Sequence, residues 1–234
     1  ELENGQLINN SFFKNKISIL IVASLHSTRL PRKALLKIKN KNLLQHLIER
    51  VKLSKFADSI ILCTSNTKLD DPLVRIAKKE NVNVVRGDTK DVLSRFVKAI
   101  DKFKLNHIVR VTGDDILIDP HHLDLAIKQH IETNSDYTTC YDLPKGTEGE
   151  IISSEAIKKV FYLAEDSSYS EYMTYYFTQN SLFRKSNLEI KKKYQKNWNL
   201  TIDYKHQFNK VKKILNFIYN EKKPYTIDDL IKMS

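Results

Sequence analysis

Three cations lie close together in the segment that follows the first predicted strand. The segment reads Ala23-Ser24-Leu25-His26-Ser27-Thr28-Arg29-Leu30-Pro31-Arg32-Lys33. Arg29, Arg32 and Lys33 would form a concentrated positive site with bidentate donors, which suits a triphosphate. The segment contains no glycine and no GxxxxGK pattern, so it matches neither a P-loop nor a dinucleotide-binding turn. The alternative is an exposed basic turn without a ligand.

Acidic side chains follow two other predicted strands. Gly113-Asp114-Asp115 ends the strand at 107–112, and Asp203 ends the segment at 199–202. Carboxylates at two strand ends on one edge of a sheet can hold a Mg²⁺ ion that bridges phosphate oxygens. The alternatives are ordinary ones: Asp114 and Asp115 can be turn residues, and Asp203 can be the N-cap of the following helix.

Other polar and aromatic groups favour structural roles. The pair His121-His122 opens a predicted helix and lacks a spaced third ligand, so we do not expect a metal site there. Tyr169, Tyr172, Tyr175 and Tyr176 have helical spacing, which favours a core or dimer face over a platform for a base or sugar. Lys191–Lys193 is most simply a solvated turn, and Cys63 and Cys140 are expected to be buried free thiols.

An alternation of strands and helices would position these groups. Apolar runs typical of parallel strands covered on both faces predict the strands, and apolar residues at helical spacing predict the helices. We expect strands at 17–23, 59–64, 82–85, 107–112, 136–141, 150–153 and 199–202. We expect helices around 44–51, over 71–79, over 92–100 behind an Asp88 cap, from Asp119-Pro120, twice after 153, over 208–218 and over 225–231. This order predicts a three-layer α/β/α sandwich with a mostly parallel sheet, which binds ligands at the carboxyl ends of its strands.

Composition limits the class of protein. A chain of 234 residues predicts one domain, over 17–234, preceded by a tail or linker at 1–16. The tail is polar without an apolar segment typical of a signal peptide, and no apolar run is long enough to span a membrane, so we expect a cytoplasmic protein. The net charge is +11, but lysine is spread along most predicted helices, so we expect no nucleic-acid partner and read the charge as solvated surface.

Five motifs in order carry a resemblance to a known family. They are Ser27-Thr28-Arg29-Leu30-Pro31 with Lys33, Arg86-Gly87 with Asp91–Phe96, Arg110–Asp114 with Leu117–Pro120, Gly146 to Glu150 with Glu171 to Thr174, and Leu200–Asp203. Together they resemble the family that contains CMP-Kdo synthetase and, more closely, the SpsF-type spore-coat polysaccharide cytidylyltransferases. The resemblance runs from about Ile17 to Ile231. It implies a Rossmann-like nucleotidyltransferase (nucleotide-diphospho-sugar transferase-like) fold, usually dimeric.

The resemblance also implies substrates and residue roles. It implies CTP as donor, an acidic sugar or sugar-like acceptor, and Mg²⁺ as cofactor. Arg29, Lys33 and Asp114 would be the catalytic residues, and Asp114 and Asp203 the metal ligands. The implied nucleotide-binding residues are Ala23, Ser24, Ser27, Arg29, Arg32, Lys33, Arg86, Asp91, Arg95 and Thr112. Glu150 and Glu171 would lie on the acceptor side.

The chain departs from the family pattern at four positions. Relatives commonly have arginine at the position of Ser24 and glycine at that of Arg32. The first change removes a phosphate contact, and the second removes a permissive backbone position. Tyr172 replaces a histidine of the SpsF pattern and Tyr175 replaces a proline, which leaves the acceptor open.

The reaction implied is attack by an acceptor hydroxyl on the α-phosphorus of CTP, with release of pyrophosphate. Two other classes stay open. A glycosyltransferase on a similar scaffold would use a nucleotide-sugar, but the Asp-x-Asp motif common in such enzymes is absent from the sequence. A non-catalytic nucleotide- or RNA-binding module would bind RNA with steep salt dependence and no turnover.

Overall fold

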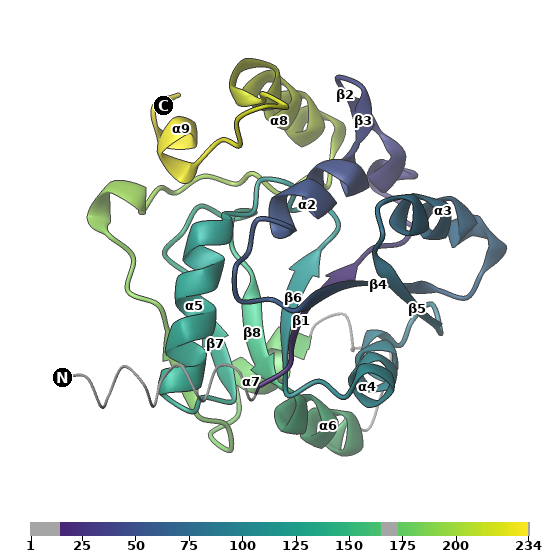
Figure 1. Ribbon diagram of the computed structural model, residues 1–234, viewed down its shortest axis with the longest axis vertical. Helices are drawn as coiled ribbons and strands as arrows, with labels where there is room; N and C mark the ends of the chain where they lie inside the picture. Colours follow the sequence, from purple (N-terminus) through teal and green to yellow (C-terminus); the bar gives the residue numbers. More distant parts are fainter. Residues whose placement is uncertain (1–14, 165–172, 234) are drawn as a thin grey trace.

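A seven-stranded sheet forms the centre of the molecule (Figure 1). The structure, a computed structural model, describes residues 15–164 and 173–233. The strands of this sheet are β1 (Ile17–Val22), β4 (Ser59–Ser65), β5 (Asn83–Gly87), β6 (His107–Thr112), β7 (Tyr137–Thr139), β8 (Glu150–Ser153) and β9 (Lys185–Asn187). They lie in the order β5-β4-β1-β6-β8-β7-β9. The first four are mutually parallel, β8 is antiparallel to both its neighbours, and β9 is parallel to β7.

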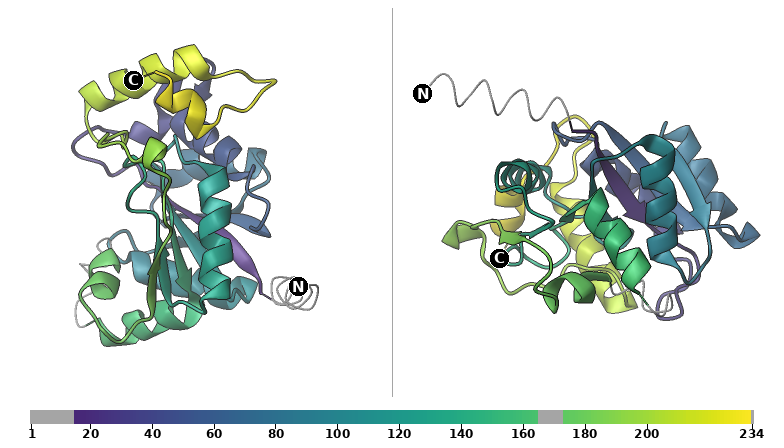
Figure 2. Two further views of the ribbon diagram at one scale, coloured as in Figure 1. Left: turned by 90° about the vertical axis from the view of Figure 1, so that its left-hand side faces the viewer. Right: turned by 90° about the horizontal axis from the view of Figure 1, so that it is seen from below.

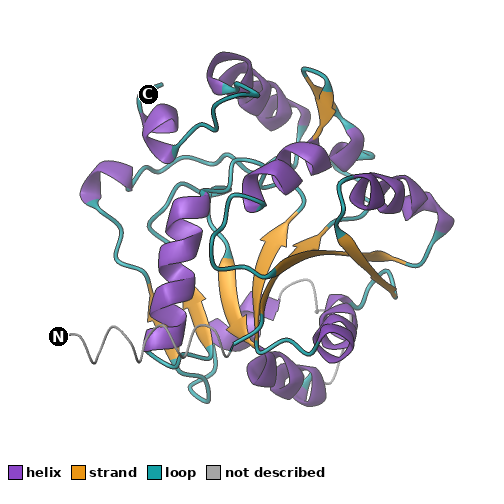
Figure 3. Cartoon of the chain, viewed as in Figure 1, coloured by secondary structure: helices purple, strands orange, loops and turns teal. Residues whose placement is uncertain are grey.

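Helices cover both faces of this sheet, as Figure 3 shows in purple and orange. One layer contains α4 (Val92–Phe103), α6 (Ser154–Leu163) and α7 (Met173–Thr178). The other contains α2 (Leu43–Val51), α3 (Asp71–Lys79) and α5 (Pro120–Glu132). In β1 the alternate residues Ile19 and Ile21 belong to the core under α2 and α5, whereas Leu20 belongs to the core under α4 and α6. The predicted three-layer α/β/α class is therefore confirmed.

The C-terminal part forms one end of the molecule. Helices α8 (Lys205–Ile218) and α9 (Ile227–Ile231) lie there in contact with each other, and α8 also contacts β2 (Lys37–Ile38), which forms a small ribbon with β3 (Lys41–Asn42). The left view of Figure 2 shows these yellow helices at the end opposite α6 and α7. Phe208, Val211 and Leu215 of α8 join the same core as α2.

Two local predictions were wrong. Helix α4 is capped by Asp91, whose side chain accepts from the Ser94 amide at 2.9 Å, and not by Asp88. The carboxylate of Asp88 instead closes the preceding turn by accepting from the Lys90 amide at 2.8 Å. Both aspartates satisfy the N-cap preference, and the path of the loop selects Asp91, which directly precedes the first helical residue, Val92.

The predicted strand at 199–202 is also not a strand of the sheet. This extended segment makes a single bridge between Asn199 and Lys145, and its Ile202 amide donates to the Asp114 carbonyl at 3.2 Å. It therefore runs against the loop after β6 rather than adding to the sheet. The predicted strand at 136–141 is shorter than expected, and the edge strand β9, whose residues Lys185–Asn187 have no apolar alternation, was not predicted.

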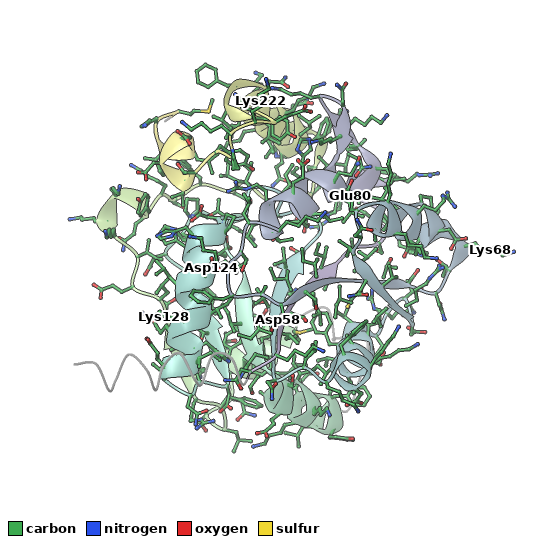
Figure 4. All side chains as sticks on the ribbon, viewed as in Figure 1. Asp58, Lys68, Glu80, Asp124, Lys128 and Lys222 are labelled. Atoms are coloured by element: carbon green, nitrogen blue, oxygen red, sulfur yellow. The ribbon has the colours of Figure 1, made fainter. Side chains whose placement is uncertain are left out.

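Several predictions about single side chains can be compared with the structure. Cys63 and Cys140 are buried and free, as predicted. Tyr175 is exposed, Tyr176 packs partly against the core, and Tyr169 and Tyr172 lie outside the described residues. In the described part of the chain no helix is long and apolar enough to cross a membrane. The labelled lysines Lys68, Lys128 and Lys222 lie on separate sides of the molecule in Figure 4.

Buried His130 and half-buried His107 form a pair at the end of the sheet where β6 begins. Nδ1 of His107 is 3.1 Å from Nε2 of His130, and Nδ1 of His130 is 2.8 Å from the Thr138 hydroxyl. Burial lowers the pKa of His107 to about 4. Burial, with a smaller effect of the His107 charge, lowers the pKa of His130 to about 3.

These pKa values predict that acid destabilises the fold. An unfolded histidine has a pKa of about 6.5. Below that pH the unfolded state binds protons that the folded state does not bind, which favours unfolding. We expect the free energy of unfolding to fall between pH 6.5 and about 4, by about 2 kcal/mol per histidine from pH 7 to pH 5. Urea unfolding at several pH values measures this change. His130→Gln should remove about half of the pH dependence of the unfolding free energy that is due to the pair. An unchanged pH dependence would contradict the assignment of this effect to the two histidines.

Candidate functional site

A cleft of about 430 Å³ opens at the carboxyl ends of the parallel strands. The loop after β1, the start of α4 and the end of β6 form its walls. The predicted site residues that line it are Ala23, Ser24, Ser27, Arg29, Lys33, Arg95, Thr112 and Asp114. The edge of the sheet that the alternation of elements predicted for ligands therefore carries the cleft.

Gly113 allows the loop after β6 to lie against the end of β1. Its amide donates to the Val22 carbonyl at 2.8 Å. A Cβ atom at this position would come within 2.7 Å of the Ala23 Cβ and 3.2 Å of the Val22 oxygen. Only glycine permits this approach without moving backbone, and the approach brings Asp114 to the cationic loop.

Lys33 joins the two predicted metal-binding carboxylates. Its Nζ donates to Asp114 Oδ2 at 2.6 Å and to Asp203 Oδ1 at 2.9 Å. Arg29 Nη2 donates to the same Asp203 oxygen at 2.8 Å. The Lys33 and Asp114 side chains are only 14% and 16% exposed, whereas Arg29 is 53% exposed. The two carboxylates therefore converge on one cation inside the cleft wall, with Arg29 on the solvent side.

The charges in this cluster support one another. Burial acts against the charged form of Asp114, but the ammonium of Lys33 outweighs it and holds the pKa of Asp114 below its ordinary value. Burial also acts against the charged form of Lys33, and the two carboxylates nevertheless raise its pKa. Both groups are therefore charged at neutral pH.

Asp115 has a different role from its neighbour. Its carboxylate accepts from the Thr112 hydroxyl at 2.5 Å and from the Thr201 hydroxyl at 2.8 Å. Burial and the charge of Asp114 raise the pKa of Asp115 to about 7. Asp115 thus ties the end of β6 to the segment that carries Asp203, which is how residues so far apart in sequence are held together.

Two arginines lie on the α4 side of the cleft, Arg95 buried and Arg110 half-buried. Arg95 is 2% exposed, and its guanidinium donates to the Cys63 carbonyl at 3.3 Å. Arg110, which was not predicted as a site residue, also lines the cleft. Its position in the sequence could have indicated a role, because a charged residue inside an otherwise apolar strand needs a partner or a function.

The partner of Arg110 is Glu150. Arg110 Nη1 and the Tyr137 hydroxyl both donate to its carboxylate, and the Thr174 hydroxyl donates at 2.7 Å. Burial works against ionisation, but Arg110 and these donors hold the pKa of Glu150 below its ordinary value. Glu150, predicted on the acceptor side, thus lies behind Arg110 and is not among the residues that line the cleft.

Three of the other predicted residues are not among those that line the cleft: Arg86, Asp91 and Arg32. Arg86 donates to the carbonyls of Ser65 and Thr67 and pairs with Asp71 at 2.8 Å, so its guanidinium braces the loop after β4. Asp91 caps α4. Arg32 is exposed to solvent. Glu171 lies outside the described residues.

Arg32 has the left-handed backbone that its replacement of glycine suggested. Its φ is 54° and its ψ is 30°, immediately before the short 3₁₀ helix Lys33–Leu35. A residue with a Cβ pays a steric cost in this region that glycine does not.

Arg32→Gly should therefore stabilise the protein by about 0.5–1 kcal/mol, as measured by urea unfolding. Lys104→Gly is a matched control, because Lys104 has a φ of 55° at the end of α4 and should respond alike. Destabilisation by Arg32→Gly alone would mean that the Arg32 side chain makes a stabilising contact that outweighs the backbone cost.

The donor set suits a hard divalent cation. Mg²⁺ commonly binds one or two protein carboxylates and completes its shell with water and phosphate oxygens. Asp114 and Asp203 already share one cation, Lys33. Among the described residues no group of three or more His, Cys, Asp and Glu side chains could hold a metal. Nδ1 of His122 donates a hydrogen bond to the Asp119 carboxylate at 2.6 Å, at the start of α5.

Comparison with known proteins places these features in a family. A family model described as cytidylyltransferase matches residues 18–226. The spore coat polysaccharide biosynthesis protein SpsF of Bacillus subtilis is 34% identical over 205 residues, which are 85% of each chain. A 3-deoxy-manno-octulosonate cytidylyltransferase of Solibacter usitatus is 36% identical over 115 residues, 48% of this chain and 44% of that one.

Solved structures agree. A cytidylyltransferase from Leptospira borgpetersenii superposes with a TM-score of 0.87 at 28% identity, covering 94% of this chain and 93% of the other. The CMP:2-keto-3-deoxy-manno-octonic acid synthetase complexed with CTP has a TM-score of 0.65 at 13% identity, covering 86% and 98%. At that identity the second comparison speaks for the fold alone.

Proposed function

Because this chain belongs to the cytidylyltransferase family, we propose that it transfers CMP from CTP to an acidic sugar or sugar-like acceptor, releases pyrophosphate, and depends on Mg²⁺. The observation that carries the proposal is the convergence of Asp114 and Asp203 on Lys33, which lines the cleft together with Asp114. The names of the relatives, a spore coat polysaccharide protein and an octulosonate cytidylyltransferase, support a surface polysaccharide or glycan as the destination. We also propose a cytoplasmic enzyme that acts as a homodimer.

The charges of the residues in and around the cleft suggest which of them bind the triphosphate, the metal and the acceptor. Arg29 and Lys33 would bind the triphosphate, with Ala23, Ser24, Ser27, Arg95 and Thr112 forming the nucleotide pocket around it. Arg86 and Asp91 would act indirectly, by holding the loop after β4 and the start of α4. Asp114 and Asp203 would hold Mg²⁺, which when bound would neutralise charge on the phosphates. Arg110, oriented by Glu150, would line the acceptor side.

The chemistry asks little covalent work of the protein. The acceptor hydroxyl oxygen forms a bond to the α-phosphorus, and the bond from the α-phosphorus to the oxygen that bridges to the β-phosphorus breaks. Pyrophosphate leaves with that oxygen and its electron pair, and the hydroxyl proton passes to solvent. Alignment of the two substrates and stabilisation of the developing charge by Arg29 and Lys33 would supply most of the acceleration. Asp115 is an unsuitable base, because both its oxygens accept bonds from Thr112 and Thr201.

Product analysis tests this function. The purified protein is incubated with CTP, Mg²⁺ and a panel of acidic sugars, and pyrophosphate and the CMP-sugar are measured. Release of a nucleoside diphosphate from a nucleotide-sugar would identify a glycosyltransferase instead. Absence of turnover together with tight, salt-dependent RNA binding would identify a binding module.

A further inference from the structure

Lys33 lies where a cation is needed between two carboxylates. Its Nζ is 2.6 Å from Asp114 and 2.9 Å from Asp203, and its side chain is only 14% exposed. We propose that Lys33 occupies the divalent-cation position of the nucleotide-free protein, so that the metal binds tightly only when a nucleoside triphosphate draws Lys33 away. The inference rests on the proposed function, since it assumes that the cleft binds a triphosphate.

The ammonium and a divalent cation cannot both use this position. A magnesium ion bound to the two oxygens that Lys33 contacts, at about 2.1 Å, would lie inside the space that the ammonium fills. Two cations at such separations also repel each other strongly in a partly buried site. Arg29 shares Asp203 but is largely exposed, so Lys33 is the main competitor.

The side chain can move although its backbone is held. The Lys33 amide donates to the Leu30 carbonyl at 3.2 Å, and the Leu35 amide donates to the Arg32 carbonyl at 2.9 Å, so the 3₁₀ turn fixes the Cα position. The four-carbon stem of lysine keeps several rotatable bonds. Lys33 also lines the cleft, so its ammonium can exchange carboxylates for phosphate oxygens without a loop movement.

This exchange makes binding of the two ligands cooperative. A triphosphate that accepts the ammonium frees Asp114 and Asp203 for the metal, and a metal that displaces the ammonium delivers it to the phosphates. By linkage, each ligand must raise the affinity for the other by the same factor. Metal would therefore reach the site together with the nucleotide, and the carboxylates would not be filled by free cations beforehand.

The test uses Mn²⁺ as the probe, without nucleotide. Free Mn²⁺ is counted by electron paramagnetic resonance in titrations of the wild type, Lys33→Met and Lys41→Met. We expect Lys33→Met to bind Mn²⁺ at least about tenfold more tightly, because Asp114 loses the ammonium that it pairs with and Asp203 keeps only the exposed Arg29. Lys41 is the matched control: it is also partly buried and paired with a carboxylate, Glu49, but it lies on β3 away from the cleft. Its variant loses the same charge and should bind like the wild type.

The second measurement is nucleotide binding in the presence of EDTA. CTP should stabilise the wild type in a thermal-shift experiment and should stabilise Lys33→Met less, so the variant gains metal affinity and loses nucleotide affinity. Adding Asp114→Asn to Lys33→Met should abolish the gain in Mn²⁺ binding.

Unchanged or weaker Mn²⁺ binding by Lys33→Met would overturn the inference, and so would micromolar Mn²⁺ binding by the nucleotide-free wild type. The wild-type titration keeps the test decisive if Lys33→Met does not fold, and Lys33→Gln provides a second variant. Failure of CTP to stabilise the wild type would instead count against the proposed function, and the nucleotide-free Mn²⁺ comparison would still decide on Lys33.

Discussion

Asp114→Ala is expected to lower the rate of pyrophosphate release from CTP and acceptor by about 10³-fold or more, while the protein stays folded. Asp114 is the more deeply buried of the two carboxylates on Lys33, and its low pKa keeps it ionised at neutral pH. Its removal takes away a metal ligand and the group that orients Lys33. A coupled pyrophosphate assay with saturating CTP measures the loss, and far-UV circular dichroism checks the fold.

The control for this variant is Asp136→Ala. Asp136 is also ion-paired, to Arg184 at 3.2 Å. It directly precedes β7, at the end of the sheet opposite the cleft. The change in charge is the same, so a comparable loss of activity in both variants would point to net charge rather than to the site. Full activity of Asp114→Ala would remove the metal assignment altogether.

Glu150→Ala is expected to destabilise the protein by about 3–5 kcal/mol. The carboxylate accepts from Arg110, Tyr137 and Thr174, and the Arg110 side chain is only 17% exposed. The variant would remove the carboxylate that pairs with the largely buried guanidinium of Arg110, and it would take one acceptor from each of the Tyr137 and Thr174 hydroxyls. Urea unfolding followed by circular dichroism measures the free energy.

Two further variants separate the charge from the packing. Glu150→Gln keeps hydrogen-bonding capacity and loses only the charge, so its cost should be smaller. The double variant Glu150→Met with Arg110→Met should recover part of the stability, because it leaves no unpaired charge. Exposed Glu155 on the neighbouring helix α6 provides the reference, and its alanine variant should unfold almost like the wild type. If Glu150→Ala lowered the free energy of unfolding no more than Glu155→Ala does, the pair of Glu150 and Arg110 would not contribute to stability.

Prediction from the sequence worked best where one residue pattern had one physical outcome. The almost uninterrupted apolar run of β1 could only be a strand buried on both faces. Asp119-Pro120 did open α5, since the Asp119 side chain accepts from the His122 amide at 3.1 Å and proline suits the first helical position. The family resemblance was confirmed for the same reason, because several motifs occur in order along most of the chain.

Prediction from the sequence failed where two nearby residues satisfied the same preference. Asp88 and Asp91 are both good caps, and only the three-dimensional path of the loop selects Asp91. The apolar residues at 199–202 look like a strand, yet they pack against the loop after β6, because the sheet continues past β6 with β8 instead.

What the sequence by itself determined is the set of chemical groups and the edge of the sheet where they gather, since both follow from residue types and from the alternation of strands and helices. Tertiary structure alone decided their partners. Lys33 and Asp203 are 170 positions apart and meet because Gly113 permits a close loop and Asp115 joins two segments. Pairing of charges depends on distances of a few ångströms, and no local pattern of residues specifies those.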